Sequence, residues 1–278
     1  MRTMITIDRL AGALGAEIGG VDLSQVLSDA VIAEIRQALL DNLVICFRDQ
    51  DITPAQHYAF ASRFSEPEEY PMLKGMEEFP EIVPVVKLPH ERVNFGGIWH
   101  ADTTYTPVPP LGAILVAREL PPYGGDTIFA NMYMAYETLS DGMKAMLSGL
   151  KSVNSSAKAD ANKTREDRLV TAGKEEAKKE LIGIHPVVRT HPETGRKLLY
   201  VNYGHTVRFE NMTDDESAPL LSYLFAHQTR PEFTCRLQWR MGTVVFWDNR
   251  CVQHNPVNDY HGFKRVLHRI SLRGTKPY

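Results

Sequence analysis

The chain has 278 residues, of which 43% are hydrophobic and 23% are charged, and such a composition excludes a disordered or collagen-like protein. A formal net charge of −3 gives no broad basic surface, so nucleic acid is not an expected partner. No signal-peptide pattern or long apolar segment occurs, and the three cysteines have no CxxC spacing. We therefore expect a cytoplasmic protein that has no membrane partner.

The first third of the chain is predicted to alternate helices with short buried strands. Helices are expected over residues 29–40, after the candidate N-cap Ser28, and over 54–64, where a threonine cap precedes a proline at the first helical position. Apolar runs over 43–47 and 82–86 predict strands.

The middle of the chain contains two apolar runs, 113–117 and 127–130, on either side of a Pro/Gly-rich turn. This pattern predicts two strands that pair in antiparallel fashion. A helical stretch over 134–150 is expected to be interrupted near 140–142. Residues 151–180 are rich in Lys, Glu, Asp, Ser and Ala, which indicates a mobile segment or lid with partial helix.

The last third is predicted to be mainly strands. A hairpin is expected around residues 191–196, and an amphipathic helix over 213–227, with acidic residues in its first turn. Further strands are predicted over 235–239, 243–247 and 265–272. Many short strands with a few helices outside them predict a mainly β protein with flanking α-helices: a double-stranded β-helix, or cupin-like jelly roll. We expect a single domain over 1–278.

Two histidines and an aspartate form the candidate metal site. His100 and Asp102 are two residues apart, and in a strand both side chains project from the same face. His254, from a distant strand, would complete two imidazoles and one carboxylate, the facial triad of non-haem Fe(II) oxygenases. With ten histidines in the chain, an isolated HxD is weak evidence, but a buried polar pair needs partners and a metal supplies them.

The last predicted strand places Arg265, Leu267 and Arg269 on one face. Two guanidinium groups inside a barrel would need anions to meet them. The alternative is an exposed edge strand with scattered arginines.

The chain closely resembles the TauD/TfdA-like family, which includes taurine dioxygenase and aryloxyalkanoate dioxygenases. The resemblance runs in order from Leu10 to the C-terminus. It is carried by Trp99-His100-Ala101-Asp102, Gly124-Gly125-Asp126-Thr127, Trp247-Asp248-Asn249-Arg250, His254 and Arg265-Val266-Leu267-His268-Arg269.

The resemblance implies an Fe(II)- and 2-oxoglutarate-dependent dioxygenase. His100, Asp102 and His254 would be the iron ligands, while Arg265 and Thr127 would hold the distal carboxylate of 2-oxoglutarate in charge-assisted contacts. With O2, the enzyme would hydroxylate a C–H bond of a small anionic substrate (a carboxylate, sulfonate or sulfate ester) and release succinate and CO2. The resemblance also implies a homo-oligomer, a dimer or a tetramer.

The substrate-binding residues are predicted with less support from the sequence. Arg269 corresponds to the arginine that holds the anionic group of the substrate in the family. Phe95, Tyr105, Tyr203 and His205 are candidate pocket walls, and the alternative is that they are ordinary core residues.

Two other functions fit the same ligands. A zinc-dependent hydrolase could use two histidines and a carboxylate, but it has no need for the dicarboxylate clamp that Arg265 and Thr127 would form. A non-catalytic jelly-roll protein that binds a small anion would leave the paired ligands unexplained.

Overall fold

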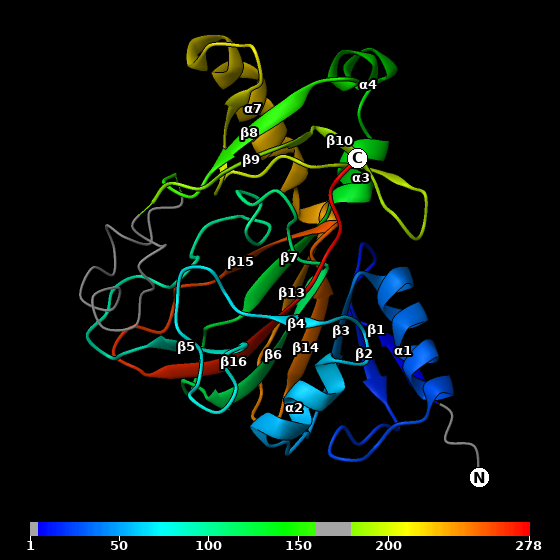
Figure 1. The fold of residues 1–278 in the computed structure, drawn as a ribbon, viewed down its shortest axis with the longest axis vertical. Coiled ribbons are helices and arrows are strands. Elements are labelled where there is room, and N and C mark those ends of the chain that lie inside the picture. The colour runs from blue at the N-terminus through cyan, green and yellow to red at the C-terminus, as the bar shows by residue number, and fades with distance from the viewer. Residues whose placement is uncertain (1–4, 159–178) are drawn as a thin grey trace.

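The computed structural model describes residues 5–158 and 179–278 (Figure 1). In chain order its elements are β1 (Thr6–Arg9), β2 (Ala16–Gly19), α1 (Asp29–Asn42), β3 (Val44–Phe47), α2 (Pro54–Ala61), β4 (Pro67–Glu68), β5 (Ile82–Lys87), β6 (Gly112–Glu119), β7 (Thr127–Asn131), α3 (Met132–Glu137), α4 (Asp141–Leu147), β8 (Lys151–Ser155), β9 (Ile182–Pro186), β10 (Val188–Thr190), β11 (Lys197–Leu199), β12 (Thr206–Phe209), α7 (Asp214–Gln228), a 3-10 helix (Pro231–Phe233), β13 (Thr234–Leu237), β14 (Val244–Asp248), β15 (Val252–Pro256) and β16 (Arg265–Leu272).

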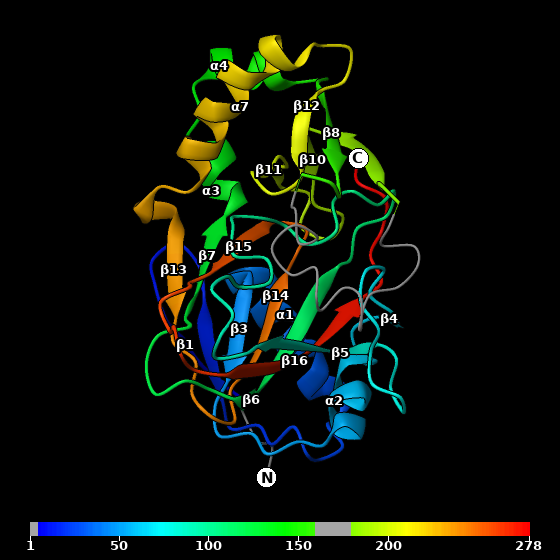
Figure 2. The same ribbon diagram turned by 90° about the vertical axis from the view of Figure 1, so that its left-hand side faces the viewer.

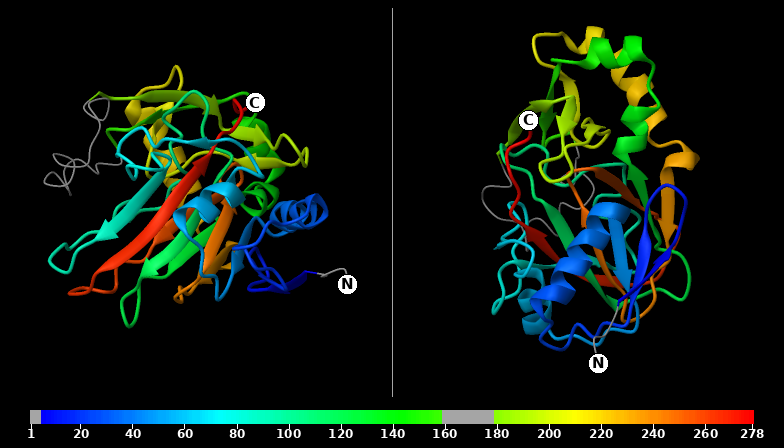
Figure 3. Two further views of the ribbon diagram at one scale, coloured as in Figure 1. Left: turned by 60° about the horizontal axis from the view of Figure 1, so that its bottom comes forward. Right: turned by 90° about the vertical axis from the view of Figure 1, so that its right-hand side faces the viewer.

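Two sheets form the body of the described structure. The larger one runs in the order β1-β2-β3-β14-β6-β16-β4, and β5 also pairs with β16. Four of its strands lie side by side in the left panel of Figure 3, as the teal β5, red β16, green β6 and orange β14 ribbons. The smaller sheet has the order β13-β7-β15 and packs against it. This is the predicted double-stranded β-helix.

The two faces of the large sheet bury different partners. Val244 and Phe246 of β14 belong to the cluster that includes buried residues of α1 and α2. Val245 and Trp247, which alternate with them, point into the second cluster, where Phe129 of the small sheet lies with its ring centroid 5.8 Å from that of Trp247. Because both faces are covered, every residue of β14 is buried, and the strand is apolar on both faces instead of alternating.

The remaining strands lie with α3, α4 and α7 at one end of the molecule (Figure 2). They form the sheets β12-β8-β9 and β10-β11. No helix of the described residues combines the length and the apolar character that a membrane crossing requires.

The structure confirms most of the predicted elements. Ser28 caps α1 by accepting from the backbone N–H of Val31, while the predicted second helix is α2 and ends at Ala61 instead of 64. Thr213 opens the predicted acidic helix as α7 through a capping box. The interrupted helix is α3 and α4, and the predicted hairpin is β10 and β11.

The predicted pairing of 113–117 with 127–130 is wrong. These runs are β6 and β7, but β6 lies between β14 and β16 in the large sheet, whereas β7 lies between β13 and β15 in the small one. The Pro/Gly-rich segment carries the chain from one sheet to the other. Local patterning identifies a strand but not its partner, because pairing in a jelly roll is non-local.

The prediction of a mobile segment over 151–180 is also wrong in its first part. Lys151–Ser155 forms β8 between β12 and β9. Its residues Ser152, Asn154 and Ser155 are buried and hydrogen-bonded: Asn154, for example, accepts from the Thr206 hydroxyl at 2.7 Å. The polar composition of this segment therefore concealed a buried strand, because its polar groups are hydrogen-bonded inside the protein. Residues 159–178 of the predicted lid lie outside the described residues, and the single-domain organisation stays a prediction.

Candidate active site

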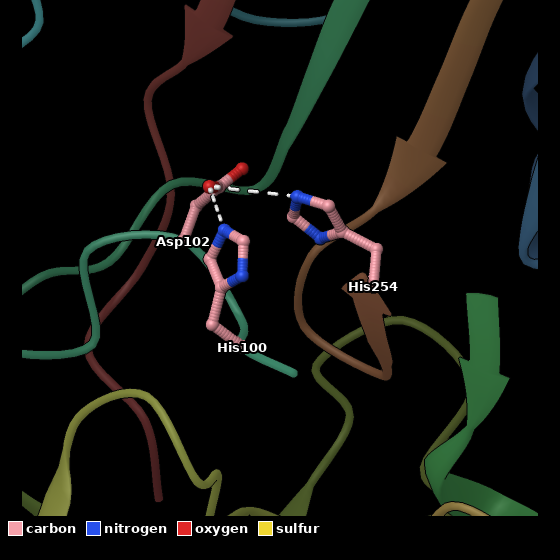
Figure 4. A group of neighbouring side chains, drawn as sticks. All are labelled: His100, Asp102 and His254. Carbon is pink, nitrogen blue, oxygen red and sulfur yellow. Dashed lines mark ion pairs between the residues drawn. The ribbon is translucent and has the colours of Figure 1, made fainter. Parts of the chain in front are cut away.

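The side chains of His100, Asp102 and His254 converge at one point (Figure 4). Nε2 of His100 lies 3.6 Å from Oδ1 of Asp102, and Nε2 of His254 lies 4.0 Å from the same oxygen. One candidate ligand atom from each residue lies within 4.8 Å of those of the other two. The predicted constellation of two imidazoles and one carboxylate is therefore present in the structure.

The backbone brings these residues together through a bridge, not through a continuous strand. His100 N donates to His254 O at 3.0 Å, and His254 N donates to His100 O at 2.9 Å. After this isolated bridge the chain turns, with Thr103 at φ 45°. The predicted strand through Asp102 is thus wrong. The turn itself aims Asp102 back at the two rings.

His100 is oriented by contacts on both sides of its ring. Its Nδ1 lies 2.7 Å from the carbonyl oxygen of Ile98, so Nδ1 donates its proton there and Nε2 keeps its lone pair for a metal. The backbone also approaches closely. A Cβ at Gly96, where φ is +67°, would lie 2.9 Å from His100 Cε1, and one at Gly204 would lie 2.9 Å from His100 Cβ.

His254 is buried among aromatic rings. Its ring centroid lies 4.7 Å from that of Trp247 and 6.0 Å from that of Phe129. Burial, and then the nearby His100, lower the pKa of His254 well below its ordinary value. The imidazole is consequently neutral, which is the form that binds a metal.

Asp102 remains ionised although it is buried. Burial by itself would raise its pKa, but the Arg269 guanidinium, followed by the two histidines, holds the pKa well below its usual range. Nη2 of Arg269 lies 3.0 Å from Oδ2 of Asp102. The other oxygen, Oδ1, is the one that faces the histidines, so the donor set fits a divalent metal with a single carboxylate oxygen as ligand.

The three side chains share a cavity with the predicted 2-oxoglutarate residues. Thr127, at the start of β7, and Arg265, at the start of β16, line it together with His100, Phe95, Trp239 and Arg269. Arg265 is 5% exposed, and it forms no ion pair with any of the described residues. Its Nε and Nη2 have no hydrogen-bond partner there. A buried guanidinium in this state favours a bound anion beside the triad.

The predicted pocket walls lie in different places. Phe95 lines the cavity, and the Tyr105 hydroxyl lies 3.3 Å from that of Tyr70, whose ring stacks beneath Arg269. His205 is buried behind His100, bonded to the Thr104 hydroxyl, and burial lowers its pKa to about 3.

Tyr203 lies at the surface. The residue is 53% exposed, and its ring centroid lies 5.7 Å from that of Phe225. The structure therefore brings Phe95 and Arg269 to the cavity, whereas Tyr105, Tyr203 and His205 do not line it.

A second group of possible metal ligands, His191, Asp248 and Cys251, is fully buried. Its polar atoms already have partners: Asp248 accepts from Arg250 at 2.6 and 2.8 Å and contacts Nε2 of His191 at 3.0 Å. Nδ1 of His191 accepts from backbone N–H groups. The positive charge of Arg250 balances the Asp248 carboxylate, and the network anchors the end of β14. These residues therefore do not need a metal to satisfy them.

Sequence reasoning missed two residues of the site. Asn249 accepts from the backbone N–H of Asp102 at 2.7 Å and donates to its carbonyl at 3.1 Å. Trp239 donates from Nε1 to the Thr127 hydroxyl at 3.0 Å. Asn249 lies within the Trp-Asp-Asn-Arg motif, but a motif gives no contact partners.

The fold and the site define a jelly-roll protein in which two histidines and one aspartate form a candidate metal site. The family model "Taurine catabolism dioxygenase TauD, TfdA family" matches residues 6–271. The chain therefore belongs to the TauD/TfdA family, and it is a dioxygenase, an oxidoreductase.

Similar proteins agree with this assignment. An alkylsulfatase from Acinetobacter baylyi is 35% identical over 281 residues, 97% of this chain and 85% of that protein. An alpha-ketoglutarate-dependent sulfate ester dioxygenase from Pseudomonas putida is 33% identical, over 98% of this chain and 91% of that protein. The crystal structure of a taurine dioxygenase from Burkholderia xenovorans has a TM-score of 0.84 at 36% identity, over 98% and 90% of the two chains. Nothing in these likenesses supports the zinc hydrolase or the non-catalytic binding protein.

Proposed function

We propose that His100, Asp102 and His254 hold the iron of this Fe(II)- and 2-oxoglutarate-dependent dioxygenase. Arg265 and Thr127 receive the distal carboxylate of 2-oxoglutarate. The observation that carries the proposal is the position of Arg265: a buried guanidinium, in no ion pair with a described residue, in the same cavity as the triad. A hydrolase would have no use for that cation beside its metal.

The bound iron, 2-oxoglutarate and O2 supply the oxidising power, and the reaction releases succinate and CO2 while a substrate C–H bond becomes C–OH. The contribution of the protein is geometric. His100 is fixed by the Ile98 carbonyl, and Asp102 is fixed by Arg269 on its outer oxygen. His254 packs against the rings of Trp247 and Phe129, which also line the cavity.

We propose an organic sulfate ester as the substrate class, and sulfonates and aryloxyalkanoates as the alternatives to be tested. Arg269 lines the cavity beside the triad, and its Nε has no hydrogen-bond partner among the described residues. It can therefore take an anionic headgroup while Nη2 stays on Asp102. The names of two similar proteins, an alkylsulfatase and a sulfate ester dioxygenase, support this class.

The chemistry of a sulfate ester gives the proposal a specific readout. Hydroxylation of the carbon that carries the ester oxygen places a hydroxyl and a sulfate on one carbon. Such a product collapses to a carbonyl compound, and inorganic sulfate leaves with the ester C–O electron pair. A sulfonate with an oxidised α-carbon would release sulfite instead.

The experiment has two stages. Anaerobic addition of Fe(II) and 2-oxoglutarate should produce a weak visible charge-transfer band that neither component gives alone. With O2, alkyl sulfates, alkyl sulfonates and aryloxyalkanoates are then compared for substrate-dependent succinate, with sulfate and sulfite measured in parallel. Absence of the band would contradict the cofactor assignment. Succinate formation with sulfonates but not with sulfate esters would contradict the substrate class.

We also propose that the protein is cytoplasmic and that each chain forms one domain. Two or four such chains assemble into a dimer or a tetramer. The three cysteines are free and buried, which suits a reducing compartment, and the oligomer is supported by the family resemblance. Light scattering of the purified protein would test the assembly, and a monomeric mass would contradict it.

A further inference from the structure

Trp239 contacts both residues of the proposed 2-oxoglutarate clamp. It follows β13, which pairs with β7 so that Leu237 lies opposite Thr127. The side chain is 8% exposed, its Nε1 lies 3.0 Å from Oγ1 of Thr127, and its ring lies 5.5 Å from the guanidinium carbon of Arg265. One side chain therefore joins two clamp residues that are far apart in the sequence.

The hydrogen bond from Trp239 determines whether the Thr127 hydroxyl donates or accepts toward the cavity. An indole N–H is only a donor, whereas a hydroxyl has one proton and two acceptor lone pairs. Because Trp239 occupies an acceptor position, the hydroxyl proton of Thr127 is left for an acceptor in the cavity. Trp239 thus converts an ambivalent hydroxyl into a donor directed at a carboxylate.

The contact with Arg265 restricts the guanidinium. The indole lies on one side of it, and on another side the Gly125 backbone, at φ +72°, leaves no room: a Cβ there would lie 3.2 Å from Arg265 Nε. A cation above an indole face is also attracted to it. The guanidinium is consequently held in place before any anion arrives, which lowers the entropic cost of binding.

We infer that Trp239 is a positioning residue that makes this site selective for 2-oxo acids with a second carboxylate. The inference rests on the proposed function, because it assumes that Thr127 and Arg265 receive the distal carboxylate. Trp239 acts through these two residues and needs no contact with the metal or with the reacting atoms.

The test compares two ligands that differ only in the distal carboxylate. N-oxalylglycine carries it, and N-methyloxamic acid has a hydrogen atom in its place. Both are titrated calorimetrically into the Mn(II)-loaded protein without O2, for wild type and Trp239→Phe, which keeps an aromatic ring and removes the N–H donor. We expect the variant to bind N-oxalylglycine about tenfold more weakly and N-methyloxamic acid unchanged.

Thr127→Val serves as the comparator. The double variant should bind N-oxalylglycine only slightly more weakly than either single variant, because both substitutions remove the same interaction. If Trp239→Phe fails to fold, incorporation of benzothienylalanine at position 239 replaces only the N–H with sulfur and repeats the measurement.

The outcomes separate the two proposals. If wild type binds the two ligands equally well, the clamp itself, and with it the proposed function, is contradicted. If wild type prefers N-oxalylglycine and the variants at 239 keep that preference, the role of Trp239 is overturned. An equal weakening of both ligands would indicate a merely structural role and would also overturn it.

Discussion

The two oxygens of Asp102 have different neighbours, and this division connects the proposed metal site to the proposed substrate site. Oδ1 faces the two histidines, whereas Oδ2 lies 3.0 Å from Arg269. Arg269 also donates to the Ser271 hydroxyl at 3.1 Å and stacks on Tyr70. Its guanidinium is therefore fixed from three directions, so an anionic headgroup would meet a preformed cation.

Removal of this cation should affect anionic substrates most. For Arg269→Ala we expect binding of an anionic substrate to weaken by roughly 30-fold or more, because a buried charge partner is worth about 2–5 kcal/mol. Steady-state succinate formation with an anionic and a neutral substrate measures the effect. Arg273→Ala, which removes an exposed arginine paired with Glu66 and Glu68, is the matched control. Equal losses on the two substrates would contradict the role of Arg269.

The carboxylate itself should be indispensable for the metal. Asp102→Asn keeps the shape of the side chain but removes the anionic ligand, and it leaves Arg269 without its partner. We expect Mn(II) affinity, followed by electron paramagnetic resonance, to fall by more than about 100-fold. Wild-type affinity in this variant would show that the metal, if bound, sits elsewhere.

At the scale of elements, the turn between β14 and β15 is hydrogen-bonded to the segment around Asp102. Asn249 is fully buried and bonds the N–H and the C=O of Asp102, and it also donates to the Pro110 carbonyl at 3.3 Å. The neighbouring Asp248–Arg250 pair anchors this turn from the other side. Two loops far apart in the sequence are thereby joined at the metal ligand.

Truncation of this amide should damage the metal site and the fold together. Asn249→Ala leaves two or three buried backbone groups unpaired, so we expect the free energy of unfolding to fall by about 3 kcal/mol. Mn(II) affinity should fall roughly tenfold or more. Urea unfolding and metal titration of the folded variant measure the two effects. In Asn42→Ala, which removes a half-buried amide at the end of α1, only stability should change. Unaltered metal affinity in Asn249→Ala would contradict its positioning role.

At the scale of the whole molecule, the helix-covered face of the large sheet contains a buried histidine remote from the metal. His57 of α2 is fully buried, with Nε2 3.2 Å from the Ile114 carbonyl of β6. Burial, reinforced by Arg118, lowers its pKa from 6.5 to about 3. The folded state therefore keeps His57 neutral at a pH where the unfolded chain binds a proton.

This difference predicts acid destabilisation. The free energy of unfolding does not depend on His57 above about pH 6.5. It falls as the pH decreases from 6.5 toward 3, because in that range only the unfolded state takes up the proton. Each pH unit in that window costs about 1.4 kcal/mol, or about 2 kcal/mol between pH 7 and pH 5. Urea unfolding of wild type and His57→Gln at pH 7 and pH 5 measures how much of this loss of unfolding free energy is due to His57. Identical pH dependence in the two proteins would contradict it.

Much of the fold and most of the candidate site follow from local sequence. The spacing of apolar residues identified α1 and α7, since burial of one face imposes a period, whereas β14 was recognised as a short continuous apolar run. The period of two also placed Arg265 and Arg269 on one buried face of β16. The side chains of His100, Asp102 and His254 suit Fe(II) but also zinc. The resemblance to the TauD/TfdA-like family, carried by motifs along the whole chain, pointed to iron and to the clamp of Arg265 and Thr127.

Other features were decided by tertiary structure alone. Partner choice for β6 and β7, burial of the polar strand β8, and the turn that directs Asp102 depend on segments distant in the chain. The same holds for Trp239, which acquires its role only when β13 aligns with β7. A local pattern encodes which face of an element is buried, whereas the identity of what covers that face is fixed only when the two sheets close on each other.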